Sequence, residues 1–218
     1  MTIISVLIVY TLVFYAVWTA WELWAKGLIT AAVSNEYLSQ FIKSGVIKNL
    51  VWTLPAILLV KRFDGEVYVG AKEMFTTKVN FLKYLPIFAA FTVFLLVGAF
   101  VTKGKIAVSE AFGLEKLIVV LFVGITEETV FRGWLLNAAL GEKKKWLSVA
   151  ANAVMFLLIH FPVWIHDGVF IENFRSFAFL SPLVLGIIFG WMFIKSKSIW
   201  IPVALHMYWD LMMFLLFE

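Results

Sequence analysis

Residues 126–134, with the sequence TEETVFRGW, stand out from the rest of the chain. They lie inside residues 117–140, a segment that is otherwise apolar enough to predict a membrane-spanning helix. Glu127, Glu128 and Arg132 are costly at such a position, because insertion scales assign roughly 2.5 to 3.5 kcal/mol to each Asp, Lys or Arg near a helix centre. Such residues face the interior of a bundle, where they perform chemistry or transport. The stretch therefore predicts a buried functional site.

The overall composition indicates an integral membrane protein. Of the 218 residues, 63% are apolar, and the mean hydropathy is +0.96. A soluble domain is closer to half apolar. The absence of cysteine excludes disulfides, thiol catalysis and thiolate zinc sites. The net charge of +4 comes from basic residues scattered over loops, which argues against nucleic-acid binding and favours topogenic lysines beside anionic lipid.

The apolar segments predict an all-α, polytopic transmembrane helical bundle of about seven to eight spans, with a functional cavity among the C-terminal helices. Pro55 is expected to kink the second span, Pro162 to end the fifth, and Pro202 to be tolerated in the first turn of the seventh. We treat residues 1–218 as a single domain, with N-terminal spans in 1–115 and a motif-bearing core in 116–218. The seven spans that we identify are residues 3–24, 46–60, 84–101, 117–140, 146–161, 177–194 and 199–217.

The spacing of the charged residues in the fourth span predicts different environments for the two glutamates. Glu128 and Arg132 are four residues apart, so they share a helix face and can pair. Glu127 points about 100° away from Glu128. We therefore expect Arg132 to hold Glu128 while Glu127 faces a cavity. The alternative is a purely structural ion-pair network that locks helices together.

Two further spans carry polar residues at helical spacing. In the fifth, Asn152, Phe156 and His160 fall on one stripe at intervals of four residues. In the seventh, His206 and Asp210 are also four residues apart and share a face. We expect the two histidines to meet the acidic stretch of the fourth span inside the bundle.

These residues make a constellation that suits acid–base chemistry. The chain's remaining histidine, His166, stands beside Asp167 and is predicted to be a solvated loop residue. Carboxylates and histidine can together supply a general base and a general acid near neutral pH. A glutamate–histidine pair can activate a water molecule, and a second histidine can donate to a developing oxyanion.

The ordered motifs resemble a known family, the CPBP intramembrane proteases. These are the CAAX proteases and bacteriocin-processing enzymes, also called the Abi family, which include the type II CAAX prenyl endopeptidases. The resemblance covers residues 117–217 and implies an all-helical, glutamate-type intramembrane endopeptidase with a cavity among its core helices. The motifs that carry it are Glu127-Glu128-x-x-x-Arg132, Phe156-x-x-x-His160 and His206-x-x-x-Asp210.

The resemblance also implies roles for individual residues. Glu127 would work with His160 to activate the attacking water, while His206 and Asp210 would position the substrate carbonyl or stabilise the oxyanion. The prenyl endopeptidases typically have Asn where Asp210 stands. An ionised Asp cannot donate to an oxyanion, so Asp210 would instead orient His206 or be protonated in an apolar pocket. The supporting residues are Glu128, Arg132, Phe156 and Asn152.

We therefore expect a multi-pass protein of a bacterial cell membrane that cleaves a membrane-associated peptide or protein within the lipid bilayer, without a cofactor or a nucleic-acid partner. The reaction would be CAAX-type, leader-type or bacteriocin-type processing, or self-immunity. One alternative is a zinc protease with Glu127, His160 and His206 as ligands, although the HExxH signature is missing. Another is a non-catalytic scaffold or regulator. A transporter is a further alternative, but no internal repeat is evident.

Overall fold

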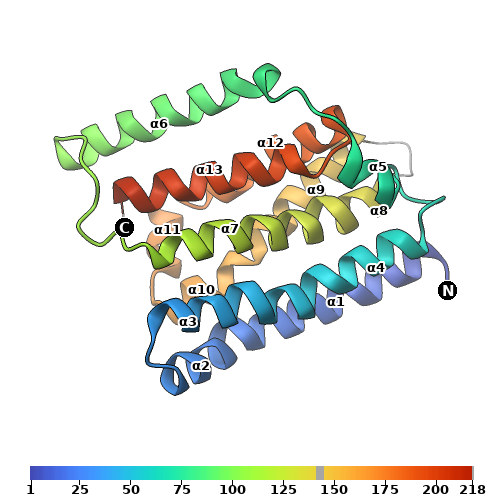
Figure 1. Ribbon diagram of the computed structural model, residues 1–218, viewed down its shortest axis with the longest axis horizontal. Helices are drawn as coiled ribbons and strands as arrows, with labels where there is room; N and C mark the ends of the chain where they lie inside the picture. Colours follow the sequence, from blue (N-terminus) through green and yellow to red (C-terminus); the bar gives the residue numbers. More distant parts are fainter. Residues whose placement is uncertain (141–144, 218) are drawn as a thin grey trace.

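The computed structural model describes residues 1–140 and 145–217, and within them the chain is helical with no strand. Long helices lie side by side and span the length of the molecule (Figure 1). The predicted all-helical membrane bundle is confirmed.

The first two long helices extend beyond the first two predicted spans and leave only residues 33–35 between them. Lys26, in the extension of the first helix, pairs with Glu22 over 2.7 Å. Asn35 caps the second helix by accepting from the backbone N–H of Leu38. The first helix contains α1 (Ile3–Ala20), η1 (Trp21–Ala25) and α2 (Lys26–Ala32), and the second contains α3 (Glu36–Gln40), η2 (Phe41–Ile47), η3 (Asn49–Thr53) and α4 (Leu54–Arg62); η1, η2 and η3 are π-helical.

A short helix and a long one follow before the acidic stretch. They are α5 (Ala71–Thr76) and α6 (Leu85–Lys103), with one 3-10 turn, η4 (Phe81–Tyr84), leading into α6. α6 ends at Gly104, whose φ of +68° is the left-handed conformation that glycine adopts without strain. It lies at the edge of the bundle (Figure 1) and packs on α13 through aromatic pairs such as Phe91 and Trp209, with ring centroids 5.1 Å apart.

The C-terminal half supplies the remaining helices. The predicted stop at Pro162 was wrong: α10 continues through it to His166, because Pro162 lies in the first turn of α10, where no backbone N–H is needed. Pro202 lies in the first turn of α13 as predicted. The elements are α7 (Glu115–Glu128), the π-helix η5 (Thr129–Leu136), α8 (Asn137–Ala139), α9 (Lys145–Leu158), α10 (His160–His166), α11 (Phe170–Arg175), α12 (Leu180–Ser196) and α13 (Trp200–Phe217).

Five helices in the described part of the chain are long and apolar enough to cross a membrane. The continuous helix of α7, η5 and α8, together with the shorter α12, corresponds to the other two predicted spans. The total of seven to eight spans stays a prediction. The helices that qualify are Ile3–Ala32, Glu36–Arg62, Phe81–Lys103, Lys145–His166 and Trp200–Phe217.

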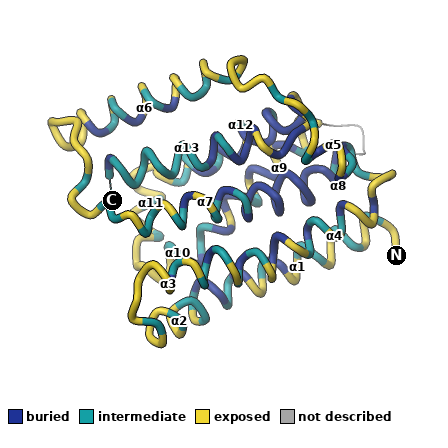
Figure 2. Tube along the Cα trace, in the orientation of Figure 1, coloured by how far each residue is buried: buried dark blue, intermediate teal, exposed yellow. Residues whose placement is uncertain are grey.

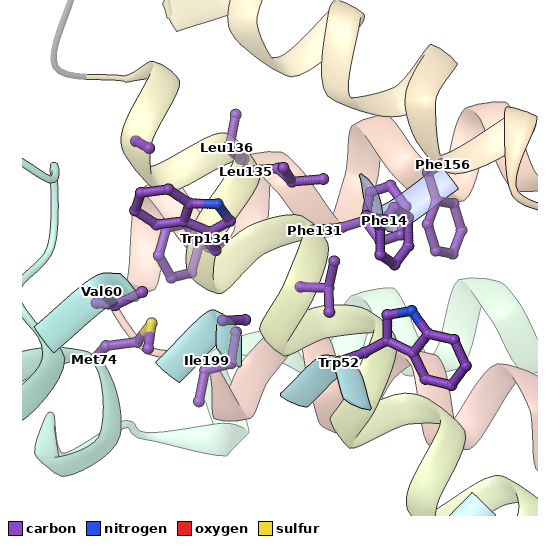
Figure 3. Packing of buried hydrophobic residues seen from close by; sticks show 14 of the residues in the cluster. Phe14, Trp52, Val60, Met74, Phe131, Trp134, Leu135, Leu136, Phe156 and Ile199 are labelled. Carbon is purple, nitrogen blue, oxygen red and sulfur yellow. The ribbon is translucent and has the colours of Figure 1, made fainter. Parts of the chain in front are cut away.

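The most deeply buried segment is η5, in which every residue is buried (Figure 2). Its Phe131 packs between Phe14 of α1 and Phe156 of α9, with ring centroids 5.6 and 5.2 Å away (Figure 3). The core therefore joins helices from both halves of the chain. On the other side, α12 approaches α9 so closely that a Cβ on Gly186 would lie 2.8 Å from the Cα of Ala153.

Candidate active site

The acidic stretch lies at the junction of α7 and η5, in the middle of the bundle. Glu128 and Arg132 have no exposed surface, and Glu127 retains 7%. The predicted pair forms: Nη1 of Arg132 donates to Oε1 of Glu128 over 2.8 Å. Nη2 of Arg132 donates to the carbonyl of Gly186 over 3.1 Å. Gly186 is also the residue at which α12 approaches Ala153 of α9.

Aromatic rings enclose the arginine. The guanidinium carbon lies 4.4 Å from the ring centroid of Phe156 and 5.3 Å from that of Phe189. Cation–π contacts of this kind are worth about 2 kcal/mol when they are desolvated. Asn152 supports the same region from α9, because its amide donates to the carbonyl of Phe131 within η5 over 3.0 Å. Two members of the predicted stripe, Asn152 and Phe156, therefore contact η5 from α9.

Three carboxylate side chains lie around the ring of His206 in α13. Its Nδ1 lies 2.8 Å from Oε1 of Glu128, and its Nε2 lies 3.4 Å from Oδ2 of Asp210 and 4.0 Å from Oε2 of Glu127. The imidazole is 5% exposed and stacks on Phe189, with centroids 5.3 Å apart. Three acids from two helices thus surround one histidine ring.

The ring of Phe156 lies close to both His160 and His206. The ring centroid of Phe156 is 5.3 Å from that of His160 and 5.7 Å from that of His206. Nδ1 of His160 donates to the backbone carbonyl of Phe156 over 2.9 Å, so in the neutral ring Nε2 is left as an acceptor. In the described part of the chain, no hydrogen bond or ion pair joins His160 to Glu127. The structure therefore does not bring the implied water-activating pair into direct contact, although His160 lies within electrostatic range of His206 and Asp210.

The third histidine is solvated, as predicted. His166 is exposed at the end of α10, rather than in a loop, and its Nδ1 lies 2.9 Å from the Asp167 carboxylate. It takes no part in the buried cluster.

A comparison with protein families supports the assignment made from the motifs. The family model described as Type II CAAX prenyl endopeptidase Rce1-like matches residues 109–212, just under half of the chain, and this range holds every motif residue. This part of the chain is therefore similar to the Rce1-like family. No curated protein and no solved structure matches the chain. The predicted family resemblance is confirmed, and the family indicates a membrane protease.

The N-terminal half adds buried charges close to the Rce1-like site that sequence reasoning missed. Glu22 of η1 is 6% exposed and Lys48 is 9% exposed, with 3.6 Å between their charged atoms. Both lie within electrostatic range of Glu127. The available signal was the acid at position 22 inside the first predicted span, with Lys26 four residues later on the same face.

The candidate ligands of the zinc alternative are not gathered into a site. Across residues 1–140 and 145–217, no group of three or more His, Cys, Asp or Glu side chains is arranged to hold a metal ion. In the Rce1-like cluster, two of the three proposed ligands, Glu127 and His206, are 4.0 Å apart, while His160 is turned toward the Phe156 carbonyl.

Proposed function

We propose that this protein is an intramembrane endopeptidase that hydrolyses a peptide bond with a water molecule activated by Glu127. The observation that carries the proposal is the placement of His206 against Glu127, Glu128 and Asp210 inside an Rce1-like bundle. A structural network needs only one acid to offset Arg132, and Glu128 already fills that role. Two further acids around one histidine favour catalysis over a scaffold.

Glu127 is the candidate general base because no strong partner occupies its carboxylate. It would take a proton from water as the water oxygen attacks the carbonyl carbon of the substrate. The unprotonated Nε2 of His160 would hold that water by accepting its second hydrogen. The carbonyl oxygen becomes an oxyanion, which the Nε2–H of a doubly protonated His206 would stabilise, since Nδ1–H donates to Glu128. Glu127 then passes its proton to the amide nitrogen as the C–N bond breaks, leaving a carboxylic acid and an amine.

Glu128 is a positioning residue in this scheme. Its Oε1 accepts from both Arg132 and Nδ1 of His206, so the orientation of the imidazole is held at one nitrogen. The other nitrogen then faces Asp210 and Glu127. Oδ2 of Asp210 lies 3.4 Å from that nitrogen, which agrees with the orienting role that the sequence suggested.

The substrate would be a membrane-associated peptide or protein that enters from the bilayer of a bacterial cell. The chain is an integral membrane protein by its long apolar helices and its family. CAAX-type cleavage follows from the family. Leader or bacteriocin processing remains within the same proposal, because the chemistry at the scissile bond is the same.

The test is cleavage of a library of membrane-anchored peptides by the purified protein in phosphatidylcholine nanodiscs, with products read by mass spectrometry. Glu127→Gln and His160→Ala should each lower the cleavage rate at least 100-fold, since a positioned acid–base group contributes roughly 10²- to 10⁴-fold. Glu66→Gln, which changes an exposed glutamate, is the matched control and should cleave normally.

Each alternative makes a different prediction in this assay. Full cleavage by both site variants would show that the site is wrongly assigned. Loss of wild-type cleavage in a strong chelator, restored by zinc, would favour the zinc protease. If no form cleaves any peptide while the variants still complement a deletion in cells, the protein is a scaffold.

A further inference from the structure

Two aromatic side chains of α1 donate hydrogen bonds to the backbone that carries His160. The hydroxyl of Tyr15 donates to the carbonyl of Met155 over 2.6 Å, and Nε1 of Trp18 donates to the carbonyl of Ile159 over 3.0 Å. The two donors are three residues apart and share a face of α1, and the two acceptors are four residues apart. These bonds join the N-terminal half of the chain to the part that the family model matches.

Each accepting carbonyl lies directly before a motif residue. Met155 precedes Phe156, and Ile159 precedes His160. A peptide unit is planar, and its plane contains the carbonyl oxygen of one residue and the Cα of the next. A donor that holds the oxygen of Ile159 therefore also restricts the Cα of His160. Tyr15 acts in the same way on Phe156, whose carbonyl accepts from Nδ1 of His160.

The helix is interrupted at this point, so the bond from Trp18 supplies a constraint that helix geometry does not. α9 ends at Leu158, Ile159 is a turn residue, and α10 begins at His160. Pro162 has no backbone N–H, so the carbonyl of Leu158, four residues earlier, lacks its usual helical donor. The helical hydrogen bonds are thus incomplete beside His160, and the indole of Trp18 holds the adjoining peptide unit from another helix.

The side chain of Trp18 is itself tightly packed. It is 4% exposed, its ring centroid lies 5.2 Å from that of Trp52, and the ammonium of Lys48 lies 4.5 Å from its ring. A paired indole N–H is not a general feature of this core: in the described part of the chain, the buried indole nitrogens of Trp52 and Trp134 have no hydrogen-bond partner. The bond from Trp18 to the backbone before His160 is therefore specific to this contact.

A row of packed rings connects α1 to the same histidine. Phe14 of α1 packs on Phe131 of η5, and Phe131 packs on Phe156 of α9 (Figure 3). The ring of Phe156 then lies 5.3 Å from that of His160, between their centroids. α1 is thus connected to His160 through two backbone hydrogen bonds and also through its side-chain packing.

We propose that Tyr15 and Trp18 are positioning residues of the peptidase, which hold His160 where its Nε2 can accept from the attacking water. The proposal rests on the proposed function, because that function assigns the water to His160 and Glu127. Both residues act through the backbone of α9 and α10. The N-terminal half, which carries none of the motifs, would thereby set the geometry of catalysis. A misplacement of about 1 Å can cost roughly 10²-fold in rate.

Cleavage kinetics in phosphatidylcholine nanodiscs test the proposal. Tyr15→Phe and Trp18→Phe each remove a donor and keep an aromatic ring. Each should lower kcat roughly 10-fold and the double variant roughly 100-fold, while KM stays within about twofold because contacts with the substrate are unchanged. Trp52→Phe makes the same change in the same aromatic cluster without loss of a hydrogen bond, and Tyr37→Phe changes an exposed tyrosine of α3. Both controls should keep the wild-type kcat.

A second measurement reports on His160 without any cleavage. The rings of the three histidines are labelled with ¹⁵N, and NMR spectra are recorded in the same nanodiscs. Tyr15→Phe and Trp18→Phe should each shift the ring resonances of His160, because the peptide unit before it or one turn earlier is released. The resonances of the exposed His166 should stay in place, as should those of His160 in Trp52→Phe.

Three results would overturn the proposal. The first is a wild-type kcat in either donor variant. The second is an equal loss of kcat in Trp18→Phe and Trp52→Phe, which would trace the loss to packing. The third is an unchanged His160 spectrum in donor variants that cleave slowly. If wild-type protein cleaves no peptide, the proposed peptidase function fails, whereas the His160 spectra still show whether α1 holds this residue, so the two failures are distinguishable.

Discussion

Arg132→Met tests whether the buried ion pair holds the site together. The change removes two hydrogen bonds, of 2.8 Å to Glu128 and 3.1 Å to the Gly186 carbonyl, and leaves the carboxylate buried with no arginine. Breaking one partner of a fully buried pair costs about 3 to 5 kcal/mol. Methionine keeps much of the apolar volume next to Phe156, so most of that loss comes from the uncompensated charge.

The assay is equilibrium unfolding in mixed dodecylmaltoside and SDS micelles, followed by tryptophan fluorescence. Arg175→Met, which changes an exposed arginine of α11, is the matched control and should alter the free energy of unfolding by less than about 0.5 kcal/mol. Adding Glu128→Gln to Arg132→Met removes the stranded charge but keeps an oxygen that can accept from His206. The double variant should therefore recover at least 2 kcal/mol relative to the single variant.

The reasoning fails on either of two results. A loss below 1 kcal/mol for Arg132→Met would mean that the carboxylate is not stranded when the arginine is removed. A double variant no more stable than Arg132→Met would mean that the loss comes from packing around the guanidinium and not from the charge of Glu128.

Three further predictions concern packing and the site. Gly186→Ala should destabilise the protein by about 1 to 3 kcal/mol in the same unfolding assay, because the new Cβ would meet the backbone of α9, whereas Gly27→Ala, with open space around it, should not. Asn152→Ala should lower the unfolding free energy by about 1 to 3 kcal/mol by leaving the carbonyl of Phe131 without its donor, and an unchanged value would remove Asn152 from the support of η5. Asp210→Asn should retain peptide cleavage within about 10-fold of wild type, because the amide oxygen can still accept from the neighbouring imidazole, while Asp210→Ala should lose more.

The contacts that could be predicted from the sequence are those within one helix. Spacing of four residues correctly placed Glu128 beside Arg132 and His206 near Asp210, because helix geometry alone determines which side chains share a face. The apolar segments located the long helices for a similar reason. Pro162 was misread because its effect depends on where the helix turn begins, which the spacing does not show.

Contacts between different helices could not be predicted from the sequence in the same way. The bond between His206 and Glu128 depends on the register of α13 against α7, and the reach of Arg132 depends on the close approach of α12. The π-helical geometry of η5 also has no clear signal in composition. These features arise from packing, in which many side chains determine a position together. The link between Lys48 and the site was missed because it joins segments far apart in the chain.

The two adjacent glutamates have different roles in our proposal. Glu128 supports the structure of the site, and Glu127 is the proposed general base. Two consecutive residues on a helix point about 100° apart, so Arg132 cannot hold both. Glu128 accepts from Arg132 and His206, and protonation of its Oε1 would disrupt both contacts. Glu127 has no hydrogen bond in the described structure and retains slight exposure. Glu127 is therefore the acid that could exchange a proton without disrupting the core, in keeping with the general base that we propose.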